Sequence, residues 1–341
     1  MNVRSMFLLA ASCIATMVPL AVSPAMAQPV ELKISTFQPL NNHYTQWLQK
    51  WIETLQRQSD NRLTGTVYPS GQLGAMPRQY DLARTGIADV AVAMHGGTPG
   101  RFPLSELSHI PFIVPNAAAA SAALTELLPD YLGEEHKGVK VLALTTGTPL
   151  ALLTTKVAVR KPEDLKGLRI RHPDSVAAAT LAALGAVPVY TETAQIADAM
   201  SKGTIDGALL AWEALESFQV SAKYAIDWDG NVTTFAMVMN PTTYARLSPE
   251  LKAVIDGNSG PSIAWAIGKV ADDAAIEGKE WARRNGMEVI ELTAEERKVF
   301  EAATRPAMAD LVAEKQKKGL KAEQMISAFK ERMASAKDKA P

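Results

Sequence analysis

Cysteine and histidine, the side chains that most often serve thiol chemistry and metal ligation, are scarce in this chain, with 1 and 5 copies in 341 residues. Cys13 lies in an N-terminal apolar run typical of a signal peptide, so the mature chain would hold no thiol. A catalytic thiolate, a thiolate metal site and a disulfide are then excluded. The histidines are widely spaced, without the helical pairs of zinc enzymes: His43, His95, His109, His136 and His172. The sequence therefore predicts no metal site and no cofactor.

No charge of one sign dominates either, since 35 basic residues face 36 acidic ones and the formal net charge is -1. A basic stripe of the kind that binds nucleic acid is therefore not expected. The chain also has no G-x-x-x-x-G-K-[ST] phosphate loop and no G-x-G-x-x-G dinucleotide turn. These absences argue against the common nucleotide-dependent enzymes.

The first residues have the order of a cleavable export signal. Arg4 precedes an apolar run over residues 6–22, and Ala25-Met26-Ala27 follows as an A-x-A site. Pro19 interrupts the run, which is shorter than the roughly 20 apolar residues of a membrane span. We therefore expect a signal peptide over residues 1–27, cut after Ala27, and a periplasmic protein. A lipid-anchored form cut before Cys13 is the less favoured alternative.

Strand-like and helix-like patterns alternate along the rest of the chain. The first series predicts strands at 30–34, 64–68, 88–94 and 139–144, with helices at 43–58, 79–84 and 116–128. The second predicts strands at 168–171, 187–190 and 205–211, with helices at 176–184 and 194–201. A strand at 235–240 and helices after Pro249 and Pro261 follow. Such alternation is typical of an α/β protein whose mostly parallel sheets are flanked by helices.

Two series of this kind favour two lobes, since one hydrophobic core seldom serves a chain of this length. We expect residues 28–150 and about 237–270 in the first lobe, and 151–236 and about 271–334 in the second. Residues 335–341 are expected to form a flexible polar tail.

One loop resembles part of an enzyme. His95-Gly96-Gly97 is similar to the oxyanion-hole loop of lipases, but that function requires a G-x-S-x-G nucleophile turn, which the chain does not contain. A glycine-rich loop at a strand end is the favoured interpretation. A periplasmic hydrolase that uses the same cleft stays open as an alternative, as does a ligand-sensing partner of a membrane receptor.

An ordered set of short motifs resembles the TRAP transporter solute-binding proteins of the DctP type. The set comprises Tyr68-Pro69-Ser70-Gly71-Gln72-Leu73-Gly74, Gly86-x-Ala88-Asp89, Pro111-Phe112-Ile113, the stretch from Glu163 to Arg171, residues 184–189, residues 203–207 and Met239-Asn240. The resemblance implies two α/β lobes joined by crossing strands and a hinge helix. It also implies a non-enzymatic monomer that closes over a small carboxylate and delivers it to TRAP membrane permease subunits.

Arg171 is the expected ligand anchor. It lies at the carboxyl end of a predicted parallel strand, the edge where open α/β sheets bind ligands. A guanidinium can hold a carboxylate through two parallel charge-assisted hydrogen bonds. Arg169 is expected to be a surface cation. Asn240 matches an asparagine of the family and could donate to the second carboxylate oxygen, although Asn240-Pro241 is also an ordinary turn dipeptide.

The remaining candidates are side chains near strand ends. Trp212 is either a pocket wall or a core residue, and Leu209 stands where many relatives have a glutamate. The loss of that acid favours a monocarboxylate with an apolar or aromatic body over a dicarboxylate. Several strand-end residues could face the cleft: Phe37, Gln38, His43, His95, Tyr190 and Phe235. The identity of the ligand, and whether a metal ion assists its binding, stay open.

Overall fold

The computed structural model describes residues 29–336, and the structural statements below concern that part of the chain. The expected signal peptide and the last five residues of the expected tail lie outside it. Within residues 29–336, no helix combines the length and the apolar character needed to cross a membrane.

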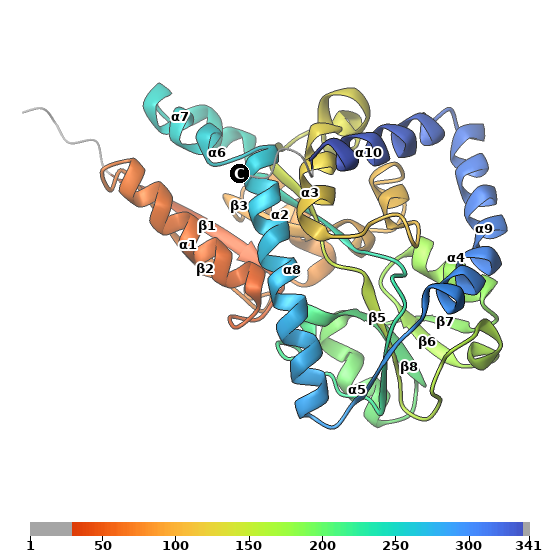
Figure 1. Ribbon diagram of the computed structural model, residues 1–341. Coiled ribbons are helices and arrows are strands. Elements are labelled where there is room, and N and C mark those ends of the chain that lie inside the picture. Colours follow the sequence, from red (N-terminus) through yellow and green to blue (C-terminus); the bar gives the residue numbers. More distant parts are fainter. Residues whose placement is uncertain (1–28, 337–341) are drawn as a thin grey trace, which may run out of the picture.

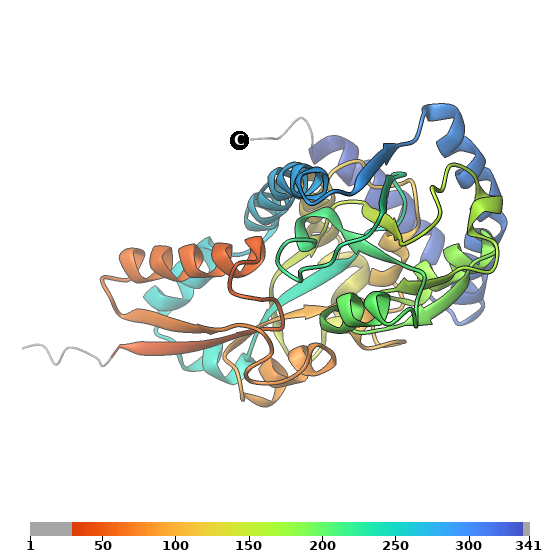
Figure 2. The ribbon, with the colours of Figure 1, turned by 90° about the horizontal axis from the view of Figure 1, so that it is seen from below.

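The first lobe is built on a five-stranded sheet with the order β2-β1-β3-β10-β4. Its strands are β1 (Val30–Thr36), β2 (Leu63–Tyr68), β3 (Val90–Met94), β4 (Lys140–Thr146) and β10 (Thr234–Met239). Its helices are α1 (His43–Gln58), α2 (Gln79–Thr85), α3 (Ala117–Glu126), α6 (Pro241–Arg246) and α7 (Pro249–Gly257). Figure 2 shows α1 covering one face of the β1 and β2 ribbon. The helix begins where the Asn42 side chain accepts the Tyr44 N–H, a typical N-cap.

The second lobe contains a six-stranded sheet with the order β11-β9-β5-β8-β6-β7. Its strands are β5 (Leu150–Thr154), β6 (Arg169–His172), β7 (Val187–Tyr190), β8 (Gly207–Ala211), β9 (Tyr224–Asp227) and β11 (Glu288–Glu291). Helices α4 (Ser175–Ala183), α5 (Ile196–Ser201) and α9 (Ala294–Lys317) accompany it. The sequence did not predict β5, β9 or β11. β5 is a short strand buried along its whole length, so it lacks the alternation that marks a half-buried strand.

Both sheets are mixed, because each contains a strand that runs against its neighbours. β10 is antiparallel to β3 and β4, and β5 is antiparallel to β8 and β9. The chain crosses from the first sheet to the second through residues 147–149, between β4 and β5, and returns through residues 228–233, between β9 and β10. The expected α/β fold with two lobes and crossing strands is confirmed.

Helix α8 (Pro261–Arg284) extends over both lobes. It packs against α1 and α3 of the first lobe and against the short helix Trp212–Ala214 and β11 of the second. In Figure 1 it runs from the neighbourhood of α6 and α7 down to the second lobe. Close approach at its second-lobe end depends on Gly278, where an added Cβ would lie 2.1 Å from the Trp212 carbonyl oxygen.

The C-terminal helix α10 (Ala322–Ala336) belongs to the first lobe, so the expected placement of residues 271–334 in the second lobe is wrong for this helix. Met325 and Phe329 are buried in the same core as Tyr80 and Leu124 of the first lobe. Figure 1 shows α10 beside α3, whereas α9 packs along α4 of the second lobe. The alanine-rich α3 leaves room for larger side chains, and α10 supplies them.

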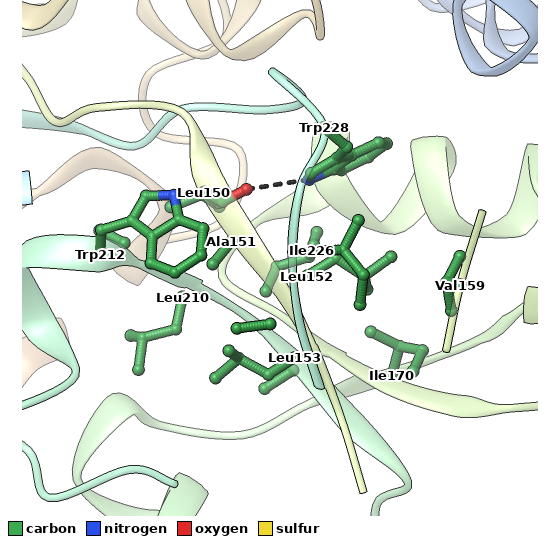
Figure 3. Close-up of a cluster of buried hydrophobic side chains, with 14 of the residues drawn as sticks. Leu150, Ala151, Leu152, Leu153, Val159, Ile170, Leu210, Trp212, Ile226 and Trp228 are labelled. Atoms are coloured by element: carbon green, nitrogen blue, oxygen red, sulfur yellow. Dashed lines mark hydrogen bonds between the residues drawn. The ribbon is translucent and has the colours of Figure 1, made fainter. Parts of the chain in front are cut away.

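The core of the second lobe gathers large apolar side chains around β5 and β8. Trp228, fully buried, lies in the segment that leads to β10. Its indole N–H donates to the Leu150 carbonyl at 2.9 Å, which ties the two crossing segments together (Figure 3). The polar tip of this tryptophan is thereby satisfied inside an apolar core.

Candidate ligand-binding site

The ends of strands from both lobes meet at one cavity. From the first lobe, the carboxyl ends of β1, β3 and β4 and the start of β10 supply Phe37, Met94, Thr146 and Phe235. From the second lobe, β6, β8 and β5 supply Arg171, Leu210 and Leu150. The cavity holds about 610 Å³ when its opening to solvent is included. A concave, mostly apolar site between lobes is the usual setting for a small ligand.

Arg171 lies inside this cavity with only 2% of its surface exposed. Its guanidinium is fixed by three hydrogen bonds. Nε donates to the Thr191 carbonyl at 2.9 Å, one terminal nitrogen donates to the Leu209 carbonyl at 2.9 Å, and the other donates to Thr193 Oγ1 at 3.2 Å. A side chain held in this way is pre-organised for a ligand.

The guanidinium retains capacity for an anion. An arginine has five N–H donors, and three of these have partners among residues 29–336, so each terminal nitrogen keeps one N–H without a partner there. No carboxylate of the described residues forms an ion pair with Arg171. Burial lowers the pKa of Arg171 to about 10, so the group stays cationic at neutral pH. A buried cation of this kind attracts a carboxylate.

Aromatic and aliphatic side chains form the walls of the cavity. The rings of Phe37 and Phe235 stack with centroids 6.5 Å apart, and the Tyr44 ring meets Phe235 edge-on at 6.0 Å. Leu210 and Phe218 line the second-lobe side. Aromatic walls of this kind suit a flat, apolar ligand body.

The lip of the cavity is bridged by a polar contact between the lobes. The Asn42 side-chain amide, beside α1, donates to Ser217 Oγ of the second lobe at 3.2 Å. Gln38 also lines the cavity, and its amide oxygen accepts a hydrogen bond from Thr36 Oγ1. The contact between Asn42 and Ser217 joins the two lobes beside the cavity.

Glu213 is a carboxyl in the cavity that the sequence analysis missed. It follows Trp212 in the turn after β8. Its Oε2 accepts a hydrogen bond from Thr148 Oγ1 at 2.6 Å, and its Oε1 accepts one from the Thr148 N–H at 3.3 Å. Burial raises the pKa of Glu213 to about 7, even though the hydrogen bonds from Thr148 lower it. The sequence did contain one indication that Glu213 is a site residue, because this acidic residue directly follows the apolar run 207–212 at a strand end.

The structure brings four predicted site residues to the cavity: Arg171, Phe37, Gln38 and Phe235. His43 also reaches its lining. Arg169 lies outside and pairs with Asp206 at 2.9 Å, as expected for a surface cation. Ligand contacts by the residues in the cavity stay predictions.

Asn240 lies far from the cavity, contrary to expectation. It follows the last residue of β10, whereas the cavity lies at the first residues of that strand. Its amide donates to the Ala83 carbonyl at 2.8 Å, and its side-chain oxygen accepts the Thr243 N–H at 2.9 Å. Asn240 is therefore the N-cap of α6, and its assignment as a ligand contact is wrong.

Three further candidates also lie outside the cavity lining. Trp212 is 2% exposed and packs in the second-lobe core (Figure 3), which decides between its two interpretations. His95 is fully buried, and its Nδ1 lies 2.7 Å from Thr234 Oγ1. Tyr190 is 46% exposed on the edge strand β7. The predicted ligand contacts by Trp212 and His95 are therefore wrong, whereas a contact by Tyr190, which lies near enough to Arg171 for their charges to interact, stays a prediction.

Leu209, whose apolar side chain was expected to face the ligand, does not line the cavity. The side chain of Leu209 is fully buried in the second-lobe core, and only its carbonyl meets Arg171. The wall of the cavity is formed instead by Leu210 and Ala211, which are apolar, and by Glu213. The wall is therefore apolar along β8 but does contain one acid.

Behind the cavity, a buried ion pair joins the lobes. His109 Nδ1 of the first lobe lies 3.0 Å from Asp174 Oδ2 of the second, and both side chains are fully buried. Burial lowers the pKa of His109, but the carboxylates of Asp174 and Glu106 outweigh it and raise the pKa above its ordinary value. Burial raises the pKa of Asp174, but His109 and the Ala177 N–H hold it below its ordinary value.

The loop His95-Gly96-Gly97 lies against the same joint. A Cβ added at Gly96 would lie 2.6 Å from Asp174 Cβ and 2.9 Å from the Pro173 carbonyl oxygen. Glycine at this position therefore permits the lobes to touch. Residues 29–336 contain no group of three or more histidine, cysteine or acidic side chains placed to hold a metal ion.

Comparison with known proteins agrees with this geometry. The family model "Bacterial extracellular solute-binding protein, family 7", named DctP, matches residues 34–315. A TRAP solute-binding protein of Rhodoferax ferrireducens, solved with copurified benzoate, is 31% identical, with a TM-score of 0.88 over 91% of this chain and 100% of that one. A marine metagenome TRAP solute-binding protein, solved with 3-hydroxybenzoate, is 29% identical, with a TM-score of 0.86 over 91% and 99%.

A curated relative is the 2,3-diketo-L-gulonate-binding periplasmic protein of Escherichia coli. It is 26% identical over 307 residues, which are 87% of this chain and 91% of the relative. The two solved relatives are TRAP solute-binding proteins, and the curated one is a periplasmic binding protein. With a family match over most of its length and two lobes around a cavity with a buried arginine, the chain belongs to the DctP family of TRAP transporter solute-binding proteins.

Proposed function

We propose that this protein binds a small monocarboxylate with an apolar or aromatic body between its lobes. The carboxylate is held by Arg171, and the body lies among Phe37, Phe235 and Phe218. The observation that carries the proposal is a buried guanidinium in an apolar cavity, with one N–H on each terminal nitrogen left without a partner among residues 29–336. The benzoate and 3-hydroxybenzoate bound by two relatives support the aromatic body.

The binding cycle is a lobe movement without covalent chemistry. The chain is exported as a periplasmic protein, with its signal peptide cut after Ala27. The ligand stabilises the closed arrangement by its preference for that arrangement over the open one. The closed protein then delivers the ligand to the membrane permease subunits of the transporter. Contacts such as Asn42 to Ser217, which join the lobes at the lip, are those that must break for release.

Replacement of Arg171 by alanine tests the proposal. The loss of charge-assisted hydrogen bonds should weaken benzoate binding by about 10- to 100-fold. Isothermal titration calorimetry with benzoate measures the change. Arg171→Lys keeps the charge but not the paired donors, and we expect an intermediate affinity.

The matched control is Arg169→Ala, two residues earlier on the same strand. Arg169 is paired with Asp206 outside the cavity, so its removal should leave benzoate affinity unchanged. Equal affinities for the wild type and both Arg171 variants would contradict the proposed anchor. If benzoate and a wider panel of monocarboxylates fail to raise the melting temperature of the wild type, the proposed ligand class is wrong.

A hydrolase in the same cleft is not favoured. The glycine-rich loop that motivated it carries His95, whose ring packs on Phe102 and His136 outside the cavity lining. Incubation of the protein with aromatic esters, followed by chromatography, should therefore give no product above the buffer control.

A further inference from the structure

Glu213 and Arg171 lie on opposite sides of the end of β8. Arg171 reaches β8 from β6, its parallel neighbour, and donates to the Leu209 carbonyl. Glu213 turns to the other side, toward Thr148, which precedes β5. β5 and β6 flank β8 on its two sides, and both side chains line the same cavity. A ligand held by Arg171 can therefore present its far end to Glu213.

The Glu213 carboxyl is held in place by its own contacts. Thr148 donates to it through both its hydroxyl and its backbone N–H. A Cβ at Gly147 would lie 3.1 Å from Glu213 Oε1 and 3.4 Å from Thr233 Oγ1, so the carboxyl fits against a bare stretch of backbone. Gly147, Thr233 and Glu213 all line the cavity. This corner gives the cavity a carboxyl in addition to the cation of Arg171.

A carboxyl oxygen has lone pairs for more than one hydrogen bond. Oε1 accepts only the long bond from the Thr148 N–H among the described residues, so it can accept another from a ligand. Burial raises the pKa of Glu213 to about 7, because this buried corner disfavours a negative charge. A ligand carboxylate beside an ionised Glu213 would be repelled, and its binding would require that one of the two carboxyls takes up a proton.

We infer that Glu213 sets the specificity of the cavity: among monocarboxylates held by Arg171, it favours those whose far end carries a neutral hydrogen-bond donor, such as a phenolic hydroxyl, and it excludes dicarboxylates. This assignment rests on the proposed function, because it presupposes the carboxylate at Arg171. Glu213 thereby contacts the end of the ligand that lies away from Arg171.

Calorimetric titrations with matched aromatic acids test the assignment. The wild type should bind meta- or para-hydroxybenzoate about 3- to 10-fold more tightly than benzoate. This is the net contribution expected from one additional hydrogen bond with a neutral donor. It should bind isophthalate and terephthalate more weakly than benzoate. In Glu213→Leu the preference for the hydroxy acids should disappear, so the ratio of their affinity to that of benzoate should fall to about 1.

A second, conservative variant controls for a folding defect in Glu213→Leu. Glu213→Gln keeps the shape and one acceptor oxygen, so it should retain part of the hydroxyl preference and weaken the exclusion of the dicarboxylates. Circular dichroism and the melting temperature check that both variants fold.

The outcomes separate the two proposals. If benzoate binds through Arg171 but wild type and Glu213→Leu show the same order among these acids, the role of Glu213 is overturned and the proposed function stands. If an aminomethyl-substituted benzoate binds more tightly than both hydroxybenzoates, Glu213 selects a cation, and the assignment to a neutral donor is wrong. If no monocarboxylate with an aromatic or an aliphatic body binds, both proposals fail.

Discussion

Replacement of Gly278 by leucine is expected to destabilise the protein by about 3 kcal/mol or more. A Cβ at this position would lie 2.1 Å from the Trp212 carbonyl oxygen and 2.5 Å from its carbonyl carbon. These are backbone atoms, so no side-chain rotation can relieve the overlap, and α8 must move away from the second lobe. Chemical denaturation followed by circular dichroism measures the loss.

The same substitution should also weaken binding of the hydroxybenzoates, since the displaced turn contains Glu213. The matched control is Gly257→Ala in α7, where a Cβ meets nothing within 4 Å. Alanine there should leave the free energy of unfolding unchanged or raise it slightly, because glycine has the lower helix propensity. If Gly278→Leu has the stability of the wild type, the close approach of α8 to the Trp212 turn is wrong.

Replacement of Asp174 by alanine is the second change with a large expected effect, a loss of about 2–4 kcal/mol. The Asp174 carboxylate caps α4 by accepting the Ala177 N–H at 2.9 Å. It also faces His109 across the joint between the lobes. Loss of the cap accounts for about 1 kcal/mol, and the orphaned His109 and the buried gap account for the rest.

Asp174→Asn separates the two contributions, because asparagine is an equally good N-cap but carries no charge. Its destabilisation should therefore be smaller than that of Asp174→Ala. Thermal unfolding of the three proteins at one pH gives the comparison. If both variants lose the same stability, the cap is not the origin of the additional loss.

The ion pair also predicts how the difference between wild type and Asp174→Asn depends on pH. The pKa of Asp174 is held low, so its contribution is present above the ordinary value of about 4 and is lost as pH falls through the lowered pKa. The pKa of His109 is raised, so its contribution is full below about 6.5 and is lost as pH rises through the raised pKa. The difference should be largest between about pH 4 and pH 6.5.

Three other charged groups lie near the pair. Glu106 lies beside His109, and its own pKa is raised by burial. His172 and Arg171 lie on the strand that leads to Asp174. All three are present in both proteins, so the difference between wild type and Asp174→Asn reports mainly on the pair. A difference that does not vary with pH would contradict the ionic character of the contact.

Much of the fold could be predicted from the sequence, because the elements with a strong local pattern need no tertiary information. The helix at 43–58 has a regular apolar stripe and an N-cap, and its predicted bounds match those of α1. Short strands without alternation were missed, as β5 shows. The sequence also could not predict which lobe α10 packs against. The apolar face of an amphipathic helix can pack on any complementary surface.

The residues of the candidate site also differ in whether the sequence could predict them. The place of Arg171 at the cavity was predictable, because open α/β sheets bind ligands at the carboxyl ends of their strands and the resemblance to the family points to the same arginine. Glu213 was not, since its place in the cavity depends on a turn and on Thr148, which is 65 residues earlier in the chain.

The sequence by itself determined that this is an α/β protein with alternating strands and helices and an arginine at a strand end. Only the tertiary structure decided which strand ends meet. Phe235 and Asn240 stand at opposite ends of one strand, roughly 16 Å apart at about 3.3 Å per residue, so both cannot face one cavity. Because β10 runs antiparallel to β3 and β4, its first residue meets their carboxyl ends and its last residue does not. A local pattern predicts a strand, but the direction of a strand in a sheet is set by its neighbours.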